Sequence, residues 1–360
     1  MNHGNQSATR RIWWLVPASL LLSMPTLADC PAGQVPLLPN LRAVPPHDIS
    51  MADATNMRFS ATSWNAGDGK LELVPRNPVT DSTGTTKQPV DQRVYCTGGT
   101  SYLKPAGSAA YHPTHNHVHY NDYANYILEP DTTGSVNPRK GTKTTFCIMD
   151  TSGVNTQLKG ASGSAVFNWC PTQDPNFNSQ GMSVGWGDTY TANLSGQTIS
   201  VANLVPGMYR LRHVFDPKFL LLEKSDEDNE SCRKVEIGDG ANGRYVTDRG
   251  PCTALPVPRM DSMSPATIAA NSCVTATIYG ASLVPELRFA FATGTGPLPN
   301  IKNVTFDVAG NYATGTVCVP AVRKGKKGGL GNDPVWDVRV TSNWGGYASV
   351  TKTNLLRVTN

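Results

Sequence analysis

Short runs of strand-forming residues, separated by glycine and proline, constrain this chain more than any other feature. The 360 residues include 33 glycines and 27 prolines, and no long stretch repeats its apolar residues with the 3.6-residue period of a helix. Turn-forming sequences such as 65–69 (Asn-Ala-Gly-Asp-Gly) and 205–207 (Val-Pro-Gly) punctuate the runs. This spacing predicts an all-β fold of the sandwich or barrel type.

The expected strands fall into two groups, separated by a stiff linker. The linker lies within residues 249–259, where Gly250-Pro251 and Pro256-Val257-Pro258 restrict the backbone. The first group comprises residues 57–64, 70–74, 93–96, 115–128, 144–149, 198–202 and 208–215, and the second 273–279, 287–292, 303–308, 313–319, 336–341 and 347–358. We therefore expect a β-sandwich-like domain over residues 29–250 and an immunoglobulin-like β-sandwich over residues 259–360.

Residues 1–28 have the pattern of an export signal. Arg10 and Arg11 precede the short apolar run 12–24, and Thr26-Leu27-Ala28 is typical of a cleavage site. The run is too short and too interrupted by proline to read as a membrane-spanning helix. The sequence therefore predicts a secreted or periplasmic protein with no membrane span.

The eight cysteines agree with export. They form an even set with no C-x-x-C pair, which in an exported chain indicates disulfides rather than zinc ribbons. Proximity in sequence favours Cys232 with Cys252 and Cys273 with Cys318. The formal charge of +4 is small for this length, so we expect no nucleic-acid partner.

Four of the seven histidines fall within residues 112–119. His115, His117 and His119 alternate with other residues, so on an extended strand all three share one face. Imidazole is a ligand for copper, zinc, iron or nickel, and the cluster therefore predicts a metal site; the alternative is a histidine-rich surface strand. His213 lies instead among alternating apolar residues and is interpreted as a core histidine.

Three blocks follow one another along the first group of strands. They are the histidine stretch 112–119, the block 143–152 (Lys-Thr-Thr-Phe-Cys-Ile-Met-Asp-Thr-Ser) and the block 180–190 (Gln-Gly-Met-Ser-Val-Gly-Trp-Gly-Asp-Thr-Tyr). Together they resemble the catalytic domain of lysyl oxidases. The resemblance is to the bacterial type and covers roughly residues 38–237. Three blocks in matching order are far more specific than a single cluster of histidines.

The resemblance implies a copper-dependent amine oxidase. Lysyl oxidases bind one copper through three histidines, which correspond here to His115, His117 and His119. They also build a lysine tyrosylquinone (LTQ) from their own side chains, and the motifs place its two parents at Lys143 and Tyr190. The implied reaction is the oxidative deamination of peptidyl lysine or other primary amines to aldehydes, in which dioxygen is consumed and hydrogen peroxide and ammonia are released.

Amine oxidation requires an electrophilic carbonyl that no ordinary side chain offers, so this chemistry must come from a cofactor. A general base must then remove the proton from the carbon next to the amine. Asp188 is the first candidate, because it lies two residues before Tyr190 and shares its side of an extended segment. Asp122 and Asp150 are the second and third candidates.

The chain departs from the family pattern at several positions. Gly153 stands where vertebrate members have a cysteine after the Asp-Thr-Ser run, so their disulfide scheme does not hold, and the comparison leaves Cys147 to pair elsewhere, with Cys170 as one choice. His112 corresponds to the family's leading histidine. Because Pro113 follows it and disfavours a continuing strand, we interpret His112 as an outer-shell residue or an occasional fourth ligand.

The C-terminal sequence resembles a TIG/IPT domain, through residues 263–266 (Met-Ser-Pro-Ala) and 277–283 (Thr-Ile-Tyr-Gly-Ala-Ser-Leu). The resemblance implies an accessory module that binds a surface or a protein partner. The basic, glycine-rich stretch 323–329 is either a contact for an anionic surface or a solvated hairpin tip.

Two other kinds of function remain open from the residues alone. One is an exported copper-binding or adhesion protein without oxidase activity. The other is a zinc hydrolase that uses the same histidines and a metal-bound water. Only the oxidase requires both Lys143 and Tyr190, so this pair distinguishes the three hypotheses.

Overall fold

The computed structural model describes residues 29–80, 82, 86–114, 116–132, 138–171, 179–294, 296, 298–321, 334–342 and 346–359. Three sequence predictions lie outside the described residues: the export signal over residues 1–28, the metal ligand His115 and the basic stretch 323–329.

The all-β prediction is confirmed. Throughout the described ranges the regular elements are strands, and they form five sheets without a helix. Within the described ranges there is accordingly no helix long and apolar enough to cross a membrane. Strand partners are antiparallel except for β19 (Thr267–Ala269) and β25 (Val350–Thr359), which run parallel.

Three sheets build the body that contains the histidine cluster. The first has the order β12-β4-β6-β7-β8 with β1 and β5 paired to β6: β1 (Pro36–Leu37), β4 (Leu71–Pro75), β5 (Val79–Thr80), β6 (Thr86–Cys96), β7 (Ser101–His112), β8 (His117–Tyr120) and β12 (Gln180–Met182). The second has the order β10-β9-β15-β16-β17: β9 (Ala124–Pro130), β10 (Arg139–Lys140), β15 (Gly207–Phe215), β16 (Glu230–Gly240) and β17 (Gly243–Pro251). The third has the order β11-β13-β3-β14 with β2 paired to β3: β2 (Leu41–Met51), β3 (Asn56–Asn65), β11 (Ser152–Gly153), β13 (Trp186–Tyr190) and β14 (Thr198–Ser200).

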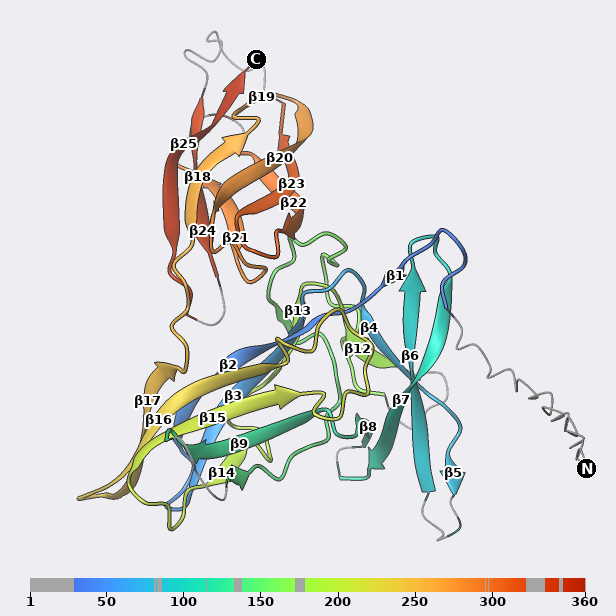
Figure 1. Ribbon diagram of the computed structural model, residues 1–360, viewed down its shortest axis with the longest axis vertical. Coiled ribbons are helices and arrows are strands. Elements are labelled where there is room, and N and C mark those ends of the chain that lie inside the picture. The colour runs from blue at the N-terminus through green and yellow to red at the C-terminus, as the bar shows by residue number, and fades with distance from the viewer. Residues whose placement is uncertain are drawn as a thin grey trace, which may run out of the picture.

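Two further sheets form the C-terminal body. One has the order β18-β20-β23-β22: β18 (Arg259–Ser264), β20 (Ser272–Ala281), β22 (Asn300–Phe306) and β23 (Tyr312–Val319). The other has the order β19-β25-β24-β21: β19 (Thr267–Ala269), β21 (Arg288–Ala292), β24 (Val335–Thr341) and β25 (Val350–Thr359). Figure 1 shows β18–β25 gathered at one end of the molecule, beyond the strands β1–β17.

Each body has its own hydrophobic core. In the β1–β17 body the core is aromatic, with Phe59, Tyr120, Tyr126 and Phe146 almost fully buried. A separate cluster, which includes Phe289 and other apolar side chains of β18–β25, forms the second core. These two cores support the predicted division between residues 29–250 and 259–360, which stays a prediction, as does the TIG/IPT resemblance.

Strand β15 shows how the sequence pattern produces a buried sheet. Its alternate residues Tyr209, Leu211, His213 and Phe215 point inward and are buried, as the two-residue period of a strand requires. The strand lies between β9 and β16. The interpretation of His213 as a core histidine is confirmed, since its ring packs against Phe215 with centroids 4.1 Å apart.

Two expected strands are wrong. The run 115–128 is divided into β8 and β9 by a turn at Asp122, which has φ = 58°; aspartate and asparagine tolerate this left-handed conformation better than most residues. The segment 144–149 makes only an isolated bridge, between Phe146 and Tyr120. Both errors come from strand-forming composition, which does not show where a chain must turn to meet its neighbours.

The eight cysteines all lie within the described residues and form four disulfides: Cys30–Cys96, Cys147–Cys170, Cys232–Cys252 and Cys273–Cys318. The two pairs favoured by proximity are confirmed, and so is the pair of Cys147 with Cys170. The remaining pair fastens the N-terminal segment to the end of β6, and proximity in sequence did not point to it.

Candidate active site

A tight hairpin brings three histidines to one face. β7 and β8 are antiparallel, with His112 opposite His117 and Ala110 opposite His119. Directly opposed residues share a face, and so do residues two apart on one strand. His112, His117 and His119 therefore lie together. The straight strand expected from His115 onward is wrong, because the chain turns at Asn116 with φ = 54°, and His115 itself lies outside the described residues.

The ring nitrogens of the cluster converge. His117 Nε2 and His119 Nε2 lie 2.8 Å apart, and the His112 and His119 rings have centroids 4.2 Å apart. Behind them, His119 Nδ1 lies 3.2 Å from the Thr145 hydroxyl, an outer contact of the kind that orients a metal-binding imidazole. Converging imidazole nitrogens fit a divalent transition metal such as copper or zinc.

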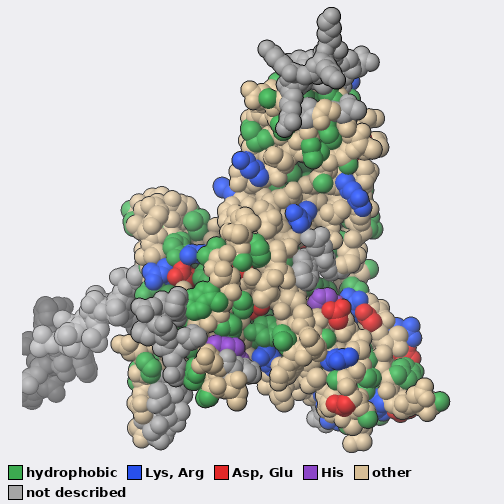
Figure 2. All heavy atoms as spheres, turned by 180° about the vertical axis from the view of Figure 1, so that it is seen from behind, with side chains coloured by type: hydrophobic (Ala, Val, Ile, Leu, Met, Phe, Trp, Pro, Cys, Tyr) green, Lys and Arg blue, Asp and Glu red, His purple; other side chains and the backbone are tan. Residues whose placement is uncertain are grey.

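His117 and His119 line a cavity of about 420 Å³ that also contains Lys143, Asp188 and Tyr190. The sequence assigned His117, His119, Lys143 and Tyr190 to the site from three separate blocks. The cavity brings these four residues together with Asp188, the first candidate for the general base. On the face shown in Figure 2, histidine side chains reach the surface of the β1–β17 body beside hydrophobic side chains.

The ammonium group of Lys143 lies over two aromatic rings. Its Nζ is 4.9 Å from the centroid of Tyr190 and 4.9 Å from that of Phe146. Burial lowers the pKa of Lys143, and attraction to Asp188 only partly offsets this effect. On the other side, Gly196 (φ = 82°) leaves so little room that an added Cβ would lie 3.1 Å from Lys143 Cβ.

Tyr190, at the end of β13, is fixed by backbone and ring contacts. Its hydroxyl accepts a hydrogen bond from Cys147 N at 3.1 Å and donates to Cys147 O at 2.9 Å. Phe146 packs edge-on against its ring, with centroids 4.8 Å apart. Burial, followed by repulsion from Asp188, raises the pKa of the Tyr190 hydroxyl well above its usual range. The ring therefore stays protonated and in one orientation.

Asp188 is a buried carboxyl inside the cavity, with 3% of its surface exposed. Met149 N donates to its Oδ2 at 3.4 Å and Thr151 Oγ1 to its Oδ1 at 3.5 Å. These long hydrogen bonds stabilise the carboxylate only weakly, and burial raises the pKa of Asp188 well above the usual value for aspartate. A carboxyl with a raised pKa is suited to accept a proton near neutral pH.

The other two candidate bases have different surroundings. Asp122 lies at the turn after β8 and forms an ion pair with Lys218 at 2.9 Å. Asp150 is buried, and its carboxylate accepts hydrogen bonds from Val166 N, Phe167 N and both donors of Ser183. Asp150 thus organises a loop, whereas of the three candidates Asp188 is the one that lines the cavity.

Several site features were not recognised in the sequence. Thr145 and Gly196 touch the predicted residues, and Cys170 lines the cavity through its disulfide with Cys147. Thr145 lies within the block 143–152, two residues after Lys143, so its position in the sequence could have identified it as a site residue. Gly196 follows a loop after β13, and only the tertiary structure brings it to Lys143.

Comparison with known proteins supports a relationship over part of the chain. Residues 90–242 match the family described as lysyl oxidase. The chain is 29% identical over 159 residues to lysyl oxidase homolog 1 of Homo sapiens, an alignment that covers 43% of this chain and 25% of that protein. It is 30% identical over 169 residues to protein-lysine 6-oxidase of Sus scrofa, covering 46% of this chain and 60% of that protein.

These alignments span less than two thirds of either relative. The family match over residues 90–242 nevertheless includes the segment from which the cavity is built, since it begins before β7 and ends after β16. The part of the chain that carries His117, His119, Lys143, Asp188 and Tyr190 therefore lies within a region that matches the lysyl oxidase family.

Proposed function

We propose that the protein is an exported copper-dependent amine oxidase that uses an LTQ formed from Lys143 and Tyr190. The observation that carries the proposal is the Lys143 amine, which stands 4.9 Å from the centroid of the Tyr190 ring in one cavity with His117, His119 and Asp188. A copper-storage site or a zinc hydrolase has no need of a lysine and a tyrosine in this arrangement.

His115, His117 and His119 would hold the copper, with His112 beside them. The converging Nε2 atoms of His117 and His119 support this assignment for the described part of the set. When present, copper and the quinone supply the carbonyl that captures a primary amine and the redox couple that passes two electrons to dioxygen.

The proximity of the Lys143 amine to the Tyr190 ring supports a bond between them, for which copper and dioxygen would supply the oxidation that joining an amine to a phenol ring requires. The two hydrogen bonds to Cys147 hold the ring, while Gly196 and Phe146 confine the lysine. Only a neutral amine is a nucleophile, so the lowered pKa of Lys143 increases the reactive fraction.

Asp188 is the proposed general base. One of its Oδ atoms would take the proton from the carbon next to the substrate nitrogen, in a cavity where its carboxyl is shielded from water. The overall reaction converts a primary amine, dioxygen and water into an aldehyde, ammonia and hydrogen peroxide. Met149 N and Thr151 Oγ1, its two hydrogen-bond partners, would orient the carboxyl.

The substrate and location follow from the same proposal. Peptidyl lysine is the first choice, since relatives carry the name protein-lysine 6-oxidase, and simpler primary amines are the second. Four disulfides suit an oxidising compartment, which supports a secreted or periplasmic location. The β18–β25 body is proposed to be an immunoglobulin-like accessory domain.

Phenylhydrazine labelling tests the function. The full chain is expressed with copper under oxygen, treated with phenylhydrazine and digested, and the peptides are mapped by mass spectrometry. We expect a labelled peptide in which Lys143 and Tyr190 are cross-linked, together with peroxide release from added primary amines. Lys143→Ala should lose both signals while retaining copper.

The matched control is Lys140→Ala, which removes an exposed lysine on β10 and should leave labelling and peroxide release intact. If copper-loaded wild-type protein shows no cross-link between Lys143 and Tyr190, the proposal that these residues form a quinone cofactor is wrong. Zinc retained in its place, with hydrolysis of an ester or amide, would instead favour the hydrolase.

A further inference from the structure

The segment 153–161, here called the strap, lies against the start of the strand that carries Asp188 and Tyr190. Val154 N and Asn155 N both donate to Gly185 O, at 3.0 and 2.9 Å. The approach is so close that only glycine fits at position 185: it has φ = 79°, and a Cβ there would lie 2.3 Å from Asn155 O. The strap is thus seated directly on the strand of the proposed active site.

The opposite edge of the strap is bound by the C-terminal body. The fully buried Asn155 donates from Nδ2 to Pro285 O at 2.7 Å and to Leu287 O at 2.8 Å. Gln157 makes a reciprocal pair with the backbone of Phe289, donating at 2.8 Å and accepting at 2.9 Å. Loss of the two Asn155 bonds would leave its buried amide group unsatisfied.

Backbone hydrogen bonds continue this contact as a short ladder. Val304 N donates to Gln157 O at 2.7 Å, and Lys159 N donates to Val304 O at 2.9 Å, so Leu158 and Val304 form a parallel bridge. The strap therefore pairs with β22 as a strand would. Main-chain pairing of this kind fixes register as well as position.

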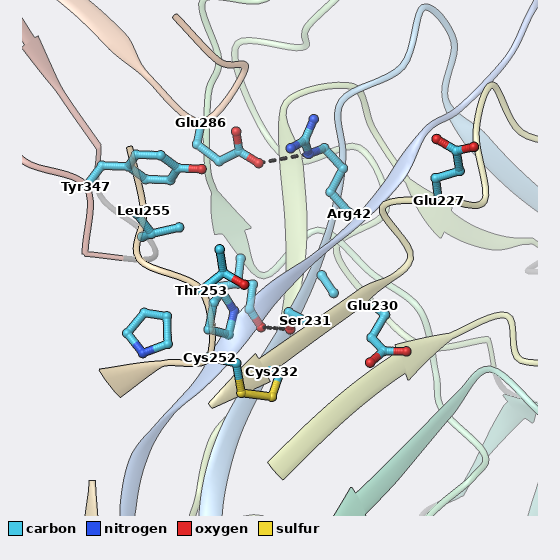
Figure 3. Close-up of a pocket in the computed structure, with 14 residues that line it drawn as sticks. Arg42, Glu227, Glu230, Ser231, Cys232, Cys252, Thr253, Leu255, Glu286 and Tyr347 are labelled. Carbon is cyan, nitrogen blue, oxygen red and sulfur yellow. Dashed lines mark hydrogen bonds and ion pairs between the residues drawn. A yellow bond between two sulfur atoms is a disulfide. The ribbon is translucent and has the colours of Figure 1, made fainter. Parts of the chain in front are cut away.

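Apolar packing and one ion pair complete the junction. Leu158 and Val154 belong to a hydrophobic cluster of the β1–β17 body against which Phe306 of β22 packs. Figure 3 shows the ion pair between Arg42 of β2 and Glu286 of the C-terminal body, with Nε and Oε1 2.8 Å apart. The two bodies are thus joined by apolar packing and an ion pair as well as by the linker.

The strap also continues into the cavity. Met149 and Thr151, just before it in the chain, line the cavity and donate the hydrogen bonds to Asp188. Strand β11, which shares Gly153 with the start of the strap, pairs with β13. One connected piece of backbone therefore runs from the contacts of Asp188 to the edge of the C-terminal body.

We propose that the C-terminal body is a positioning domain, which clamps the strap through Asn155 and Gln157 and thereby holds Met149 and Thr151 against Asp188. The part of this inference that concerns catalysis rests on the proposed function. Gln157 is accordingly a positioning residue, since it acts through the strap and touches no reacting atom. The C-terminal body would then be a component of the active unit, beyond any role in binding a surface.

Gln157→Ala in the full chain tests the clamp, because this partly buried residue loses both side-chain bonds to Phe289. Hydrogen exchange read by mass spectrometry should rise about tenfold or more in residues 149–161 and 300–306. Phenylhydrazine labelling should slow, and kcat/KM for a primary amine should fall about tenfold, since a small displacement of a catalytic group has effects of this size.

Gln92→Ala is the matched control. Gln92 makes the same reciprocal pair, with the backbone of Leu222 at 2.8 and 2.7 Å, away from the strap. The Gln92→Ala variant should lower the melting temperature yet leave the hydrogen exchange of residues 149–161 and the labelling rate unchanged.

A rescue variant adds a disulfide between Leu158→Cys and Val304→Cys to Gln157→Ala. It should restore the wild-type hydrogen exchange of residues 149–161 and the wild-type labelling rate.

Unchanged exchange in Gln157→Ala would overturn the clamp. Exchange that rises in 153–161 but not in 149–151, with labelling kinetics as in wild type, would overturn the positioning role. If the wild-type chain neither labels nor oxidises amines, the proposed function fails, and the exchange of residues 149–151 alone still decides whether the C-terminal body positions them.

Discussion

Lys143 Nζ lies 4.9 Å from the centroid of the Tyr190 ring, although the two residues are 47 positions apart in the chain. The lysine belongs to the segment after β10 and the tyrosine ends β13. Phe146 contacts both, with its centroid 4.9 Å from the lysine nitrogen and 4.8 Å from the centroid of the tyrosine ring. The aromatic core therefore sets the distance between the two parents of the proposed cofactor.

Gly196 should be required for this pairing. Gly196→Ala adds a Cβ 3.1 Å from Lys143 Cβ, so the lysine is displaced, and we expect cofactor formation, read as phenylhydrazine labelling per copper, to drop about tenfold. Gly99→Ala is the control, because Gly99 has nearly the same φ (83°) with nothing within 4 Å of its added Cβ. Both variants should lose about 1 kcal/mol of stability; equal labelling in the two would contradict the prediction.

Asp188→Asn should lower kcat/KM for a primary amine about 100-fold or more, the usual contribution of a general base. The base must be ionised to act, and burial raises the pKa of Asp188 well above its usual value. In wild type, kcat/KM should therefore increase with pH as this carboxyl loses its proton, and the increase should vanish in the variant. Asp122→Asn, which breaks an exposed ion pair with Lys218, should change kcat/KM by less than about twofold. A pH profile that Asp188→Asn leaves intact would assign the base elsewhere.

Thr145→Val should weaken metal binding by about 10- to 100-fold, as loss of an outer contact to a ligand histidine commonly does. The change keeps the shape of the side chain and removes the hydroxyl that lies 3.2 Å from His119 Nδ1. Affinity is measured by stripping the protein with a chelator and titrating copper against a chromophoric competitor. Thr144→Val, one residue away, is the control, and identical affinities for the two variants would show that Thr145 does not orient the ligand.

His213 should make the fold sensitive to acid. Burial lowers its pKa from 6.5 to about 3, although a hydrogen bond with the backbone of Val44 opposes the shift. As pH falls, the His213 imidazole is therefore protonated in the unfolded chain before it is protonated in the folded protein. The folded state keeps its full stability relative to the unfolded chain above pH 6.5 and loses part of it as pH falls from 6.5 towards 3.

Urea unfolding of wild type and His213→Phe checks this sign. The stability of wild type relative to the variant should decrease by ~1.4 kcal/mol between about pH 7.5 and about pH 5.5, the linkage expected for one histidine that stays neutral in the folded state. Buried carboxyls with a raised pKa affect stability with the opposite pH dependence; one is Glu223, whose pKa burial raises to about 8. Their contribution is the same in both proteins and cancels in the difference. A constant difference between the two proteins would mean that the buried ring is protonated at pH 5.5.

Much of the fold was predictable because it depends on local pattern. Alternation in β15 and the turn-forming residues between runs identified the strands, and the even cysteine set indicated disulfides. The turn at Asp122 and the loss of the strand at 144–149 were not predictable. Strand propensity describes a residue's fit to a pleated surface, whereas pairing depends on neighbours that are distant in sequence.

The sequence by itself determined the all-β class, the cysteine framework and the residue types of the site, because periodicity and side-chain chemistry are local properties. Only the tertiary structure decided that His112 joins His117 and His119 on one hairpin face, that Asp188 rather than Asp122 or Asp150 lines the cavity, and that the strap joins the two bodies. Each of these depends on strand register and close packing, which place residues far apart in the chain within a few ångströms of one another.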